Sequence, residues 1–385
     1  MTRAKVAVLK TRPETVIEDY ARLMRLAEFE TFLPKGVPTI LKVNISWQKY
    51  YPACSTVPWQ LEGVARTLVE SGYKDLIAGH NGTVVVDSHR GERNNRQRPV
   101  QDRYGMKTLH VTDPDTEWMR YEPKARMLVL DKVYPKGIFI PRLFPGKNVV
   151  HLPTVKTHVF TTITGAMKNA FGGLLNYQRH WTHSVIHQTL VDLLSIQKEI
   201  HPGLFAVMDG TIAGDGPGPR AMRVYVKNFI LASGDLVAID AISAKMQGFD
   251  PLKLDFIRLA HEHGLGVGDP REIEVVGEDI SEVDFRFQEG DTLASRGQKM
   301  IYHGILKPFE HILLRSPIVP WSYFASNVYY NLLWYPLVGR RRTNGMLKTE
   351  WGKLFLSYPL DSIQATREAP LGSKTAEEPL TLPLR

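Results

Sequence analysis

The feature that most constrains the fold is the alternation of short apolar runs with amphipathic segments in the first part of the chain. The runs 5–10, 39–45 and 75–81 have the length and apolar content of buried strands. Between them, residues 15–29 and 58–71 place apolar side chains three and four positions apart, which is typical of a helix with one buried face. This β-α-β-α-β order predicts an α/β fold, with a mostly parallel sheet and helices on both faces.

The same alternation continues through the rest of residues 1–287, which we interpret as one α/β domain. Residues 211–222 are rich in glycine and proline and are predicted to form a loop. Helices are predicted at 182–199, 235–248 and 254–266, and further strands at 108–113, 125–133, 137–142, 148–152, 204–210, 224–233 and 271–279.

The composition changes in residues 288–357, which we interpret as an aromatic and basic helical extension. Within it, residues 316–339 contain no charged side chain and are rich in Trp and Tyr, and arginines flank them. Their length suits a membrane span, but their prolines and asparagines argue against one. Two interpretations stay open: the segment packs on the protein body or on a second subunit of a homodimer, or it lies among the headgroups of a membrane surface. Residues 358–385 are polar and proline-rich and are predicted to be disordered.

The net charge of +8 favours an anionic partner, either a small molecule or a membrane surface. Nucleic acid is disfavoured, because no zinc-knuckle, helix-turn-helix or RNA-recognition motif is present. The single cysteine, Cys54, excludes an internal disulfide framework and a cysteine-ligated iron–sulfur cluster held by this chain alone. Together with an N-terminal apolar run too short for a signal peptide, it predicts a cytoplasmic protein. The protein would be peripheral at the inner face of the membrane if residues 316–339 contact it.

A functional site is expected in residues 151–188, which hold five of the thirteen histidines. A Thr-Gly run between two lysines opens a predicted helix at Thr164. Backbone N–H groups at a helix start, threonine hydroxyls and ammonium groups together bind anions. The predicted anion site comprises Lys156, Lys168, Thr161, Thr162 and Thr164. The alternative is that both lysines are solvated on a loop.

Four side chains of the same stretch are candidates for catalysis. His151 and His158 could transfer protons, because imidazole titrates near neutral pH. Lys168 could form a Schiff base if it is desolvated enough to lose its proton. Asn169 follows it on the same predicted helix.

Three further residues are candidates for a mononuclear transition-metal site. His183 and His187 are one helical turn apart, so both rings could point the same way. Asp209, at the end of the predicted strand 204–210, could add a carboxylate. The alternative is that the histidines lie on the surface, because their spacing lacks the frame of a known zinc motif.

The ends of other predicted strands supply additional candidates for contact with the anion. In open parallel sheets, ligands bind beyond the carboxyl ends of the strands. The candidates at these ends are Lys42, Asn44, Gly210 and Asp215. Asp235 is predicted to cap the following helix, and Asp240, inside that helix on an apolar background, is predicted to be a buried acid with a partner.

Several stretches resemble the prokaryotic family catalogued as domain of unknown function 362. They occur in order over residues 5–280 and read LKVN (41–44), STVP (55–58), LPTVKTH (152–158), TGAMKNAFG (164–172), MDG (208–210), GDGPGP (214–219), ASGDLVAIDAISAKMQG (232–248) and AHEHGLG (260–266). Members of that family often carry ferredoxin-like cysteine motifs, which this chain lacks. They usually have a proline after the first lysine, where this chain has Val43. Through Lys168 alone there is a distant resemblance to the lactate racemase family, which implies a lysine-tethered nickel pincer cofactor beside histidines.

We expect from these features an enzyme that acts on an anionic small molecule at the His/Lys/Asp site. The substrate would be lipid-linked if residues 316–339 contact a bilayer. The alternative is a non-catalytic membrane-peripheral binding or assembly protein that uses its aromatic and basic extension.

Overall fold

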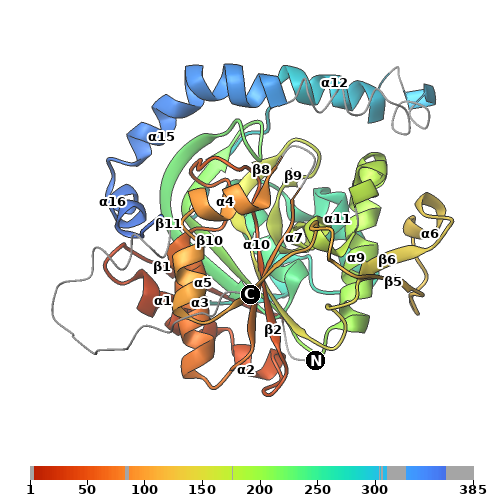
Figure 1. Cartoon of the computed structure of the whole chain (residues 1–385), viewed down its shortest axis with the longest axis horizontal. Coiled ribbons are helices and arrows are strands. Elements are labelled where there is room, and N and C mark those ends of the chain that lie inside the picture. Colours follow the sequence, from red (N-terminus) through yellow and green to blue (C-terminus); the bar gives the residue numbers. More distant parts are fainter. Residues whose placement is uncertain are drawn as a thin grey trace, which may run out of the picture.

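The central element of the protein is a ten-stranded sheet (Figure 1). The structure, a computed structural model, describes residues 4–82, 86–175, 177–302, 304, 307–309 and 327–360. The strand order is β12 (Ile273–Gly277), β1 (Ala4–Lys10), β11 (Arg223–Ser233), β10 (Leu204–Asp215), β7 (Asn148–Leu152), β2 (Thr39–Val43), β3 (Leu76–His80) and β4 (Lys107–His110). Off this path, β8 (Thr154–His158) pairs with β10 and with β9 (Thr162–Ile163). In the main path only β11 is antiparallel to its neighbours, so the predicted mostly parallel sheet is confirmed.

Helices cover both faces of the sheet, as predicted (Figure 1). Side chains alternate along each strand, so Ile40 and Leu41 of β2 enter different apolar cores. One face is covered by α1 (Val16–Leu26), α2 (Phe29–Phe32) and α3 (Pro58–Glu70). The other is covered by α7 (Gly165–Asn169), α8 (Phe171–Leu174), α9 (Ile186–Ile200), α10 (Leu236–Gln247) and α11 (Asp255–Glu262). Shorter elements are α4 (Ser88–Asn94), α5 (Arg98–Arg103), η1 (Tyr177–Val185), η2 (Pro251–Lys253), η3 (Pro270–Glu272) and η4 (Lys307–Phe309).

Two predicted elements differ from the structure. The strand predicted at 125–133 is wrong. A short helix, α6 (Leu130–Val133), forms there instead. The Asp192 carboxylate accepts hydrogen bonds from the backbone N–H groups of Leu128, Val129 and Leu130 at its start. A separate two-stranded sheet of β5 (Trp118–Tyr121) and β6 (Ile138–Pro141) flanks it. The loop predicted at 211–222 is wrong in its first part, because β10 continues to Asp215 by pairing with β11.

The C-terminal extension contains α12 (Leu293–Tyr302), the π-helix η5 (Tyr329–Gly339), α15 (Arg340–Met346) and α16 (Glu350–Ser357). Residues 327–358, called the arm below, curve around the outside of the body (Figure 1). The arm packs on the body: Trp47 lies 5.2 Å from Tyr335 between ring centroids, and Tyr50 stacks on Phe355 at 3.7 Å. Residues 316–326 of the predicted aromatic segment and 361–385 of the predicted disordered tail lie outside the described residues. In the described ranges no helix has the length and apolar character needed to cross a bilayer.

Candidate functional site

The centre of the site is a row of residues across neighbouring parallel strands. Lys42 on β2 is in register with Gly79 on β3 and His151 on β7, so Lys42 and His151 point to the same face of the sheet. The Lys42 side chain is buried, and its ammonium group donates to the carbonyl oxygen of Val43 at 2.8 Å and to Oδ1 of Asn81 at 3.1 Å. Burial and the nearby Arg179 lower the pKa of Lys42 to about 7.

The segment from α7 to α8 closes over this row. Nδ2 of Asn169 donates to the Lys42 carbonyl oxygen at 2.8 Å and lies 3.4 Å from Nδ1 of His151. A β-carbon at Gly173 would lie 3.0 Å from Cε of Lys42. The cavity that remains beside Lys42 and His151 measures about 10 Å³, which is roughly the volume needed for one water molecule. The sequence-predicted Lys42, His151 and Asn169 are therefore brought together in one buried group.

The start of α7 does not offer its backbone N–H groups to an external anion. Asp240 on α10 already occupies them, accepting from the N–H groups of Ala166 at 2.5 Å and Met167 at 3.0 Å. This corrects the predicted anion site at the helix start and confirms the predicted partner for the buried Asp240. Burial raises the pKa of Asp240 to about 7, although the two N–H groups stabilise its ionised form.

The three threonines near this helix differ in their contacts. The Thr161 hydroxyl donates to the carbonyl oxygen of Ile163 at 2.8 Å, and Thr162 has a left-handed backbone with φ of 61°. Thr164 is buried, and its hydroxyl has no hydrogen-bond partner among the described residues. Of the three, Thr164 is thus the best placed to offer a hydroxyl to a ligand.

Five cationic side chains, called the cation cluster below, surround the carboxyl ends of β2, β3 and β8. They are Lys42, Lys156, Lys168, Arg179 and Arg220. Burial lowers the pKa of Lys156 to about 8, and burial with the charges of Lys156 and Arg179 lowers that of Lys168 to about 7. In the described part of the chain, no aspartate or glutamate forms an ion pair with the three lysines or with Arg220.

The two arginines of the cation cluster are held at the strand ends by hydrogen bonds to backbone carbonyl oxygens. Nη2 of Arg179, on η1, donates to the carbonyl oxygen of Gly82 at 2.8 Å, just beyond the end of β3. Nε of Arg220 donates to the carbonyl oxygen of Ser46 at 2.9 Å, beyond the end of β2. Nζ of Lys156 donates to Oγ1 of Thr154 at 2.6 Å.

Both candidate acid–base histidines are neutral at physiological pH. Burial lowers the pKa of His151 to about 3, although Nε2 of His151 lies 2.7 Å from Oε1 of Gln197. Burial, with the charge of Lys168 as the next cause, places the pKa of His158 well below its ordinary value. The Nδ1 atom of His158 accepts from the N–H of Phe160 at 3.1 Å. Each ring is therefore uncharged and a weak base near neutral pH, so it takes part in the site as a hydrogen-bond partner.

The predicted metal ligands are not brought together. Asp209 lies in the middle of β10 and points to the opposite face from His151, where Tyr20 donates to its Oδ2 at 2.6 Å and Trp59 at 3.2 Å. His183 stacks on Tyr302, whereas His187 lies 6.0 Å from the Phe256 ring. Across the described residues, no three His, Cys, Asp or Glu side chains come close enough to hold a metal ion. The predicted triad of His183, His187 and Asp209 is wrong, because Asp209 does not lie at a strand end.

The remaining strand-end candidates have structural contacts. Nδ2 of Asn44 donates to the carbonyl oxygen of Cys54 at 3.3 Å and so holds the loop after β2. A β-carbon at Gly210 would lie 3.0 Å from the carbonyl oxygen of Phe229, so this glycine serves strand packing. Asp215 forms an ion pair with Arg223 at 2.6 Å and would repel an anion. Asn44 is adjacent to the site, but Gly210 and Asp215 are poor candidates for anion binding.

Sequence reasoning missed Asn81, Arg179 and a pair of histidines beside them. His80, the last residue of β3, is fully buried and stacks on His110 with ring centroids 4.9 Å apart. Nε2 of Gln101 donates to Nε2 of His80 at 3.0 Å, and Nδ1 of His80 has no partner among the described residues. The detectable signal was the polar pair His80-Asn81 at the end of an apolar run, directly after Gly79, which is in register with Lys42.

Comparisons with known proteins support the family resemblance. The sequence profile of the family described as domain of unknown function (DUF362) matches residues 39–245, more than half of the chain. The thylakoid-associated protein sll1697 of Synechocystis sp. is 26% identical over 240 residues, which cover 61% of this chain and 70% of that protein. No solved structure shows significant similarity to the chain.

Proposed function

The chain belongs to the family described as domain of unknown function 362, and from its site we propose that it is an enzyme acting on a small anionic molecule bound by the cation cluster. The observation that carries this proposal is that Lys42, Lys156 and Lys168 lose most of their solvent contact without an ion pair to any carboxylate in the described ranges. Burying an ammonium group without a counter-charge is costly, so such a cluster is a favourable site for an anion.

The lysines also suit proton transfer. A group whose pKa lies near the working pH can both donate and accept a proton, and the pKa of Lys42 and of Lys168 is about 7. Lys168 is half-buried, so it is the more accessible of the two and also the better candidate for a covalent Schiff base. In this proposal Lys156, Lys168 and Arg179 bind the anion, and the neutral His151 and Asn169 orient Lys42.

Calorimetric titration with inorganic phosphate and with malonate tests the proposal and separates a phosphate from a carboxylate preference. We expect Lys168→Gln to weaken binding about tenfold or more, because a charge-assisted hydrogen bond is lost. Lys107→Gln removes an exposed lysine at the start of β4 and should bind as the unchanged protein does. Binding should weaken as the pH rises above about 8, because the lysines then lose their protons. An unchanged affinity in Lys168→Gln, or no binding of either anion, would contradict the proposal.

A second candidate function, attachment to a membrane surface, is favoured by the arm. Its outward face exposes Leu332, Leu333 and Leu337, which are 68%, 51% and 76% accessible to solvent. Leu332 and Leu337 are five residues apart. In a π-helix, residues at this spacing are joined by the backbone hydrogen bonds, so the two side chains lie on one face. The exposed cations Arg340, Arg341 and Lys348 follow these leucines in the sequence. An apolar surface followed by cations suits an acidic bilayer, and a relative is named as thylakoid-associated.

Vesicle co-sedimentation tests this attachment. Vesicles that contain phosphatidylglycerol should retain the protein better than pure phosphatidylcholine, and Leu332→Glu/Leu337→Glu should abolish the difference. Leu356→Glu changes another exposed leucine of the arm, on α16, and should have a small effect. If the chain instead self-associates without lipid and the double variant is monomeric, the face is a dimer interface. Anion binding that survives the double variant would separate the two functions.

A further inference from the structure

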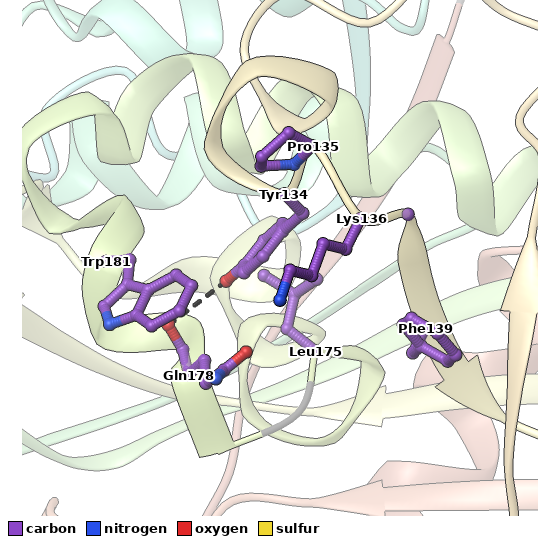
Figure 2. Close-up of a pocket in the computed structure, with 8 residues that line it drawn as sticks. Tyr134, Pro135, Lys136, Phe139, Leu175, Gln178 and Trp181 are labelled. Atoms are coloured by element: carbon purple, nitrogen blue, oxygen red, sulfur yellow. Dashed lines mark hydrogen bonds between the residues drawn. The ribbon is translucent and has the colours of Figure 1, made fainter. Parts of the chain in front are cut away.

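A pocket of about 290 Å³ opens beside the site, between the turn after α6 and the helix η1 (Figure 2). Tyr134 and Trp181 form one wall, with ring centroids 6.1 Å apart and planes inclined by 26°. Figure 2 shows Phe139 on the opposite side and Leu175 between them. Walls of this kind favour a flat, apolar ligand.

The pocket contains one ionisable cation and no acid among its lining residues. Lys136 extends across it between the Tyr134 ring and Phe139 (Figure 2). The other lining residue able to ionise is Tyr134, whose pKa is raised by burial, so its phenol stays neutral. The pocket therefore presents a single positive charge in apolar surroundings.

A tight turn fixes the position of Lys136. The N–H of Gly137 donates to the carbonyl oxygen of Tyr134 at 2.9 Å, and Pro135 restricts the backbone between them. Gly137 has a φ of 109°, which a residue with a side chain rarely adopts. The backbone that carries the ammonium group is thus ordered before a ligand arrives, which lowers the entropic cost of binding.

The helix η1 separates this pocket from the cation cluster. Residues three apart share a face of a 3₁₀-helix, so Gln178 and Trp181 face the pocket together. Arg179 and Thr182 face elsewhere, and Arg179 reaches Gly82 at the end of β3. A ligand in the pocket would contact the same helix that supplies an arginine to the cation cluster.

We propose that this pocket binds a small planar aromatic molecule that carries one negative charge, such as an aromatic carboxylate or sulfonate. The ring lies against Tyr134 and Trp181, and the anionic group meets the Lys136 ammonium. This binding site is distinct from the cation cluster and does not depend on the function proposed for it.

Two fluorescent probes of nearly the same shape test the proposal. The probe 1-anilinonaphthalene-8-sulfonate is an aromatic monoanion, and N-phenyl-1-naphthylamine is its neutral counterpart. Lys136→Gln should weaken binding of the sulfonate about three- to tenfold, as expected for one partly exposed charge contact, and leave the neutral probe unchanged. Trp181→Ala should weaken both probes.

Lys132→Gln is the matched control. Lys132 is also exposed, lies on α6 four residues earlier and does not line the pocket. The proposal is overturned if Lys136→Gln and Lys132→Gln change sulfonate binding equally, or if Lys136→Gln weakens the neutral probe as much as the anion. Lys136 is exposed on a surface turn, and a far-ultraviolet circular dichroism spectrum of each variant checks that the fold is retained.

Discussion

The carboxylate of Asp240 lies directly against the backbone of Gly165, so closely that a β-carbon on this glycine would be 2.4 Å from Oδ2. Gly165 also has a φ of 76°, in the left-handed region. The contact joins α10 to the start of α7, the helix that carries Lys168 and Asn169. The geometry of the site therefore depends on a glycine and an acid that take no part in its chemistry.

This contact predicts that Gly165→Ala destabilises the protein more than a positive φ alone would. Gly36 is the matched control, because it has a φ of 78° but no atom within 4 Å of the point that a β-carbon would occupy. We expect Gly36→Ala to cost about 1 kcal/mol of unfolding free energy. Gly165→Ala should cost about 1–3 kcal/mol more, because Asp240 must move. Chemical denaturation of both variants measures the difference, and equal losses would show that the contact is unimportant.

The low pKa of Lys42 predicts a rise of stability with pH. Its pKa is about 7 in the folded chain, against an ordinary value of 10.5. Between these values the unfolded chain holds a proton that the folded chain has released, so the free energy of unfolding increases with pH. That stabilisation is complete above about pH 10.5 and is lost progressively as the pH falls from 10.5 to 7. Lys42→Met should reduce the slope between about pH 7.5 and 9.5 by up to about 1.4 kcal/mol per pH unit.

Denaturation at several pH values measures this slope. Lys107→Met, on the exposed start of β4, should keep the slope of the unchanged protein. The same slope in Lys42→Met and the unchanged protein would mean that Lys42 keeps its proton in the folded state.

The single cysteine predicts a thiol that reacts only after unfolding. Cys54 is fully buried, and burial raises the pKa of its thiol, so little thiolate forms. Ellman's reagent should modify the native protein slowly and the protein in guanidinium chloride at once, with one equivalent released. Because the chain has no other cysteine, the signal has a single source. Rapid modification of the native protein would indicate that the loop after β2 opens easily.

The sequence predicted the layers of the fold and part of the site because both depend on local patterns. Lys42 was identified because it lies near the end of an apolar strand, and Asn169 because it follows a glycine-containing turn. Asp209 was misplaced because the acid and glycine that close the run 204–210 resemble a strand end, but pairing with β11 extends β10 beyond them. That pairing is a hairpin in which residues 210–215 pair with 223–229, so the glycines and prolines of 214–219 mark the turn after β10 and not the end of a strand at Gly210.

Arg179 could not be predicted because its role depends on tertiary distance. It reaches the end of β3 across 97 positions of the chain. It lies inside the predicted stretch 151–188, but the histidines there gave no indication that the arginine beside them contacts another strand. Asn81 was within reach of prediction, since it directly follows β3, the strand beside that of Lys42 in the sheet.

The arm depends on Trp47, which predicts that this residue controls its attachment. Trp47 is buried against Tyr330, Trp334 and Tyr335, and its Nε1 donates to Oδ1 of Asn331 at 2.9 Å. Trp47→Ala should cost about 3–5 kcal/mol of stability, as truncation of a buried tryptophan does, and release the arm before the sheet unfolds. Hydrogen exchange should then accelerate in residues 329–346 but not in β7. Trp118→Ala removes a half-buried tryptophan from β5 and should leave exchange in 329–346 unchanged. Undiminished protection of 329–346 in Trp47→Ala would show that the contacts of α16 alone hold the arm.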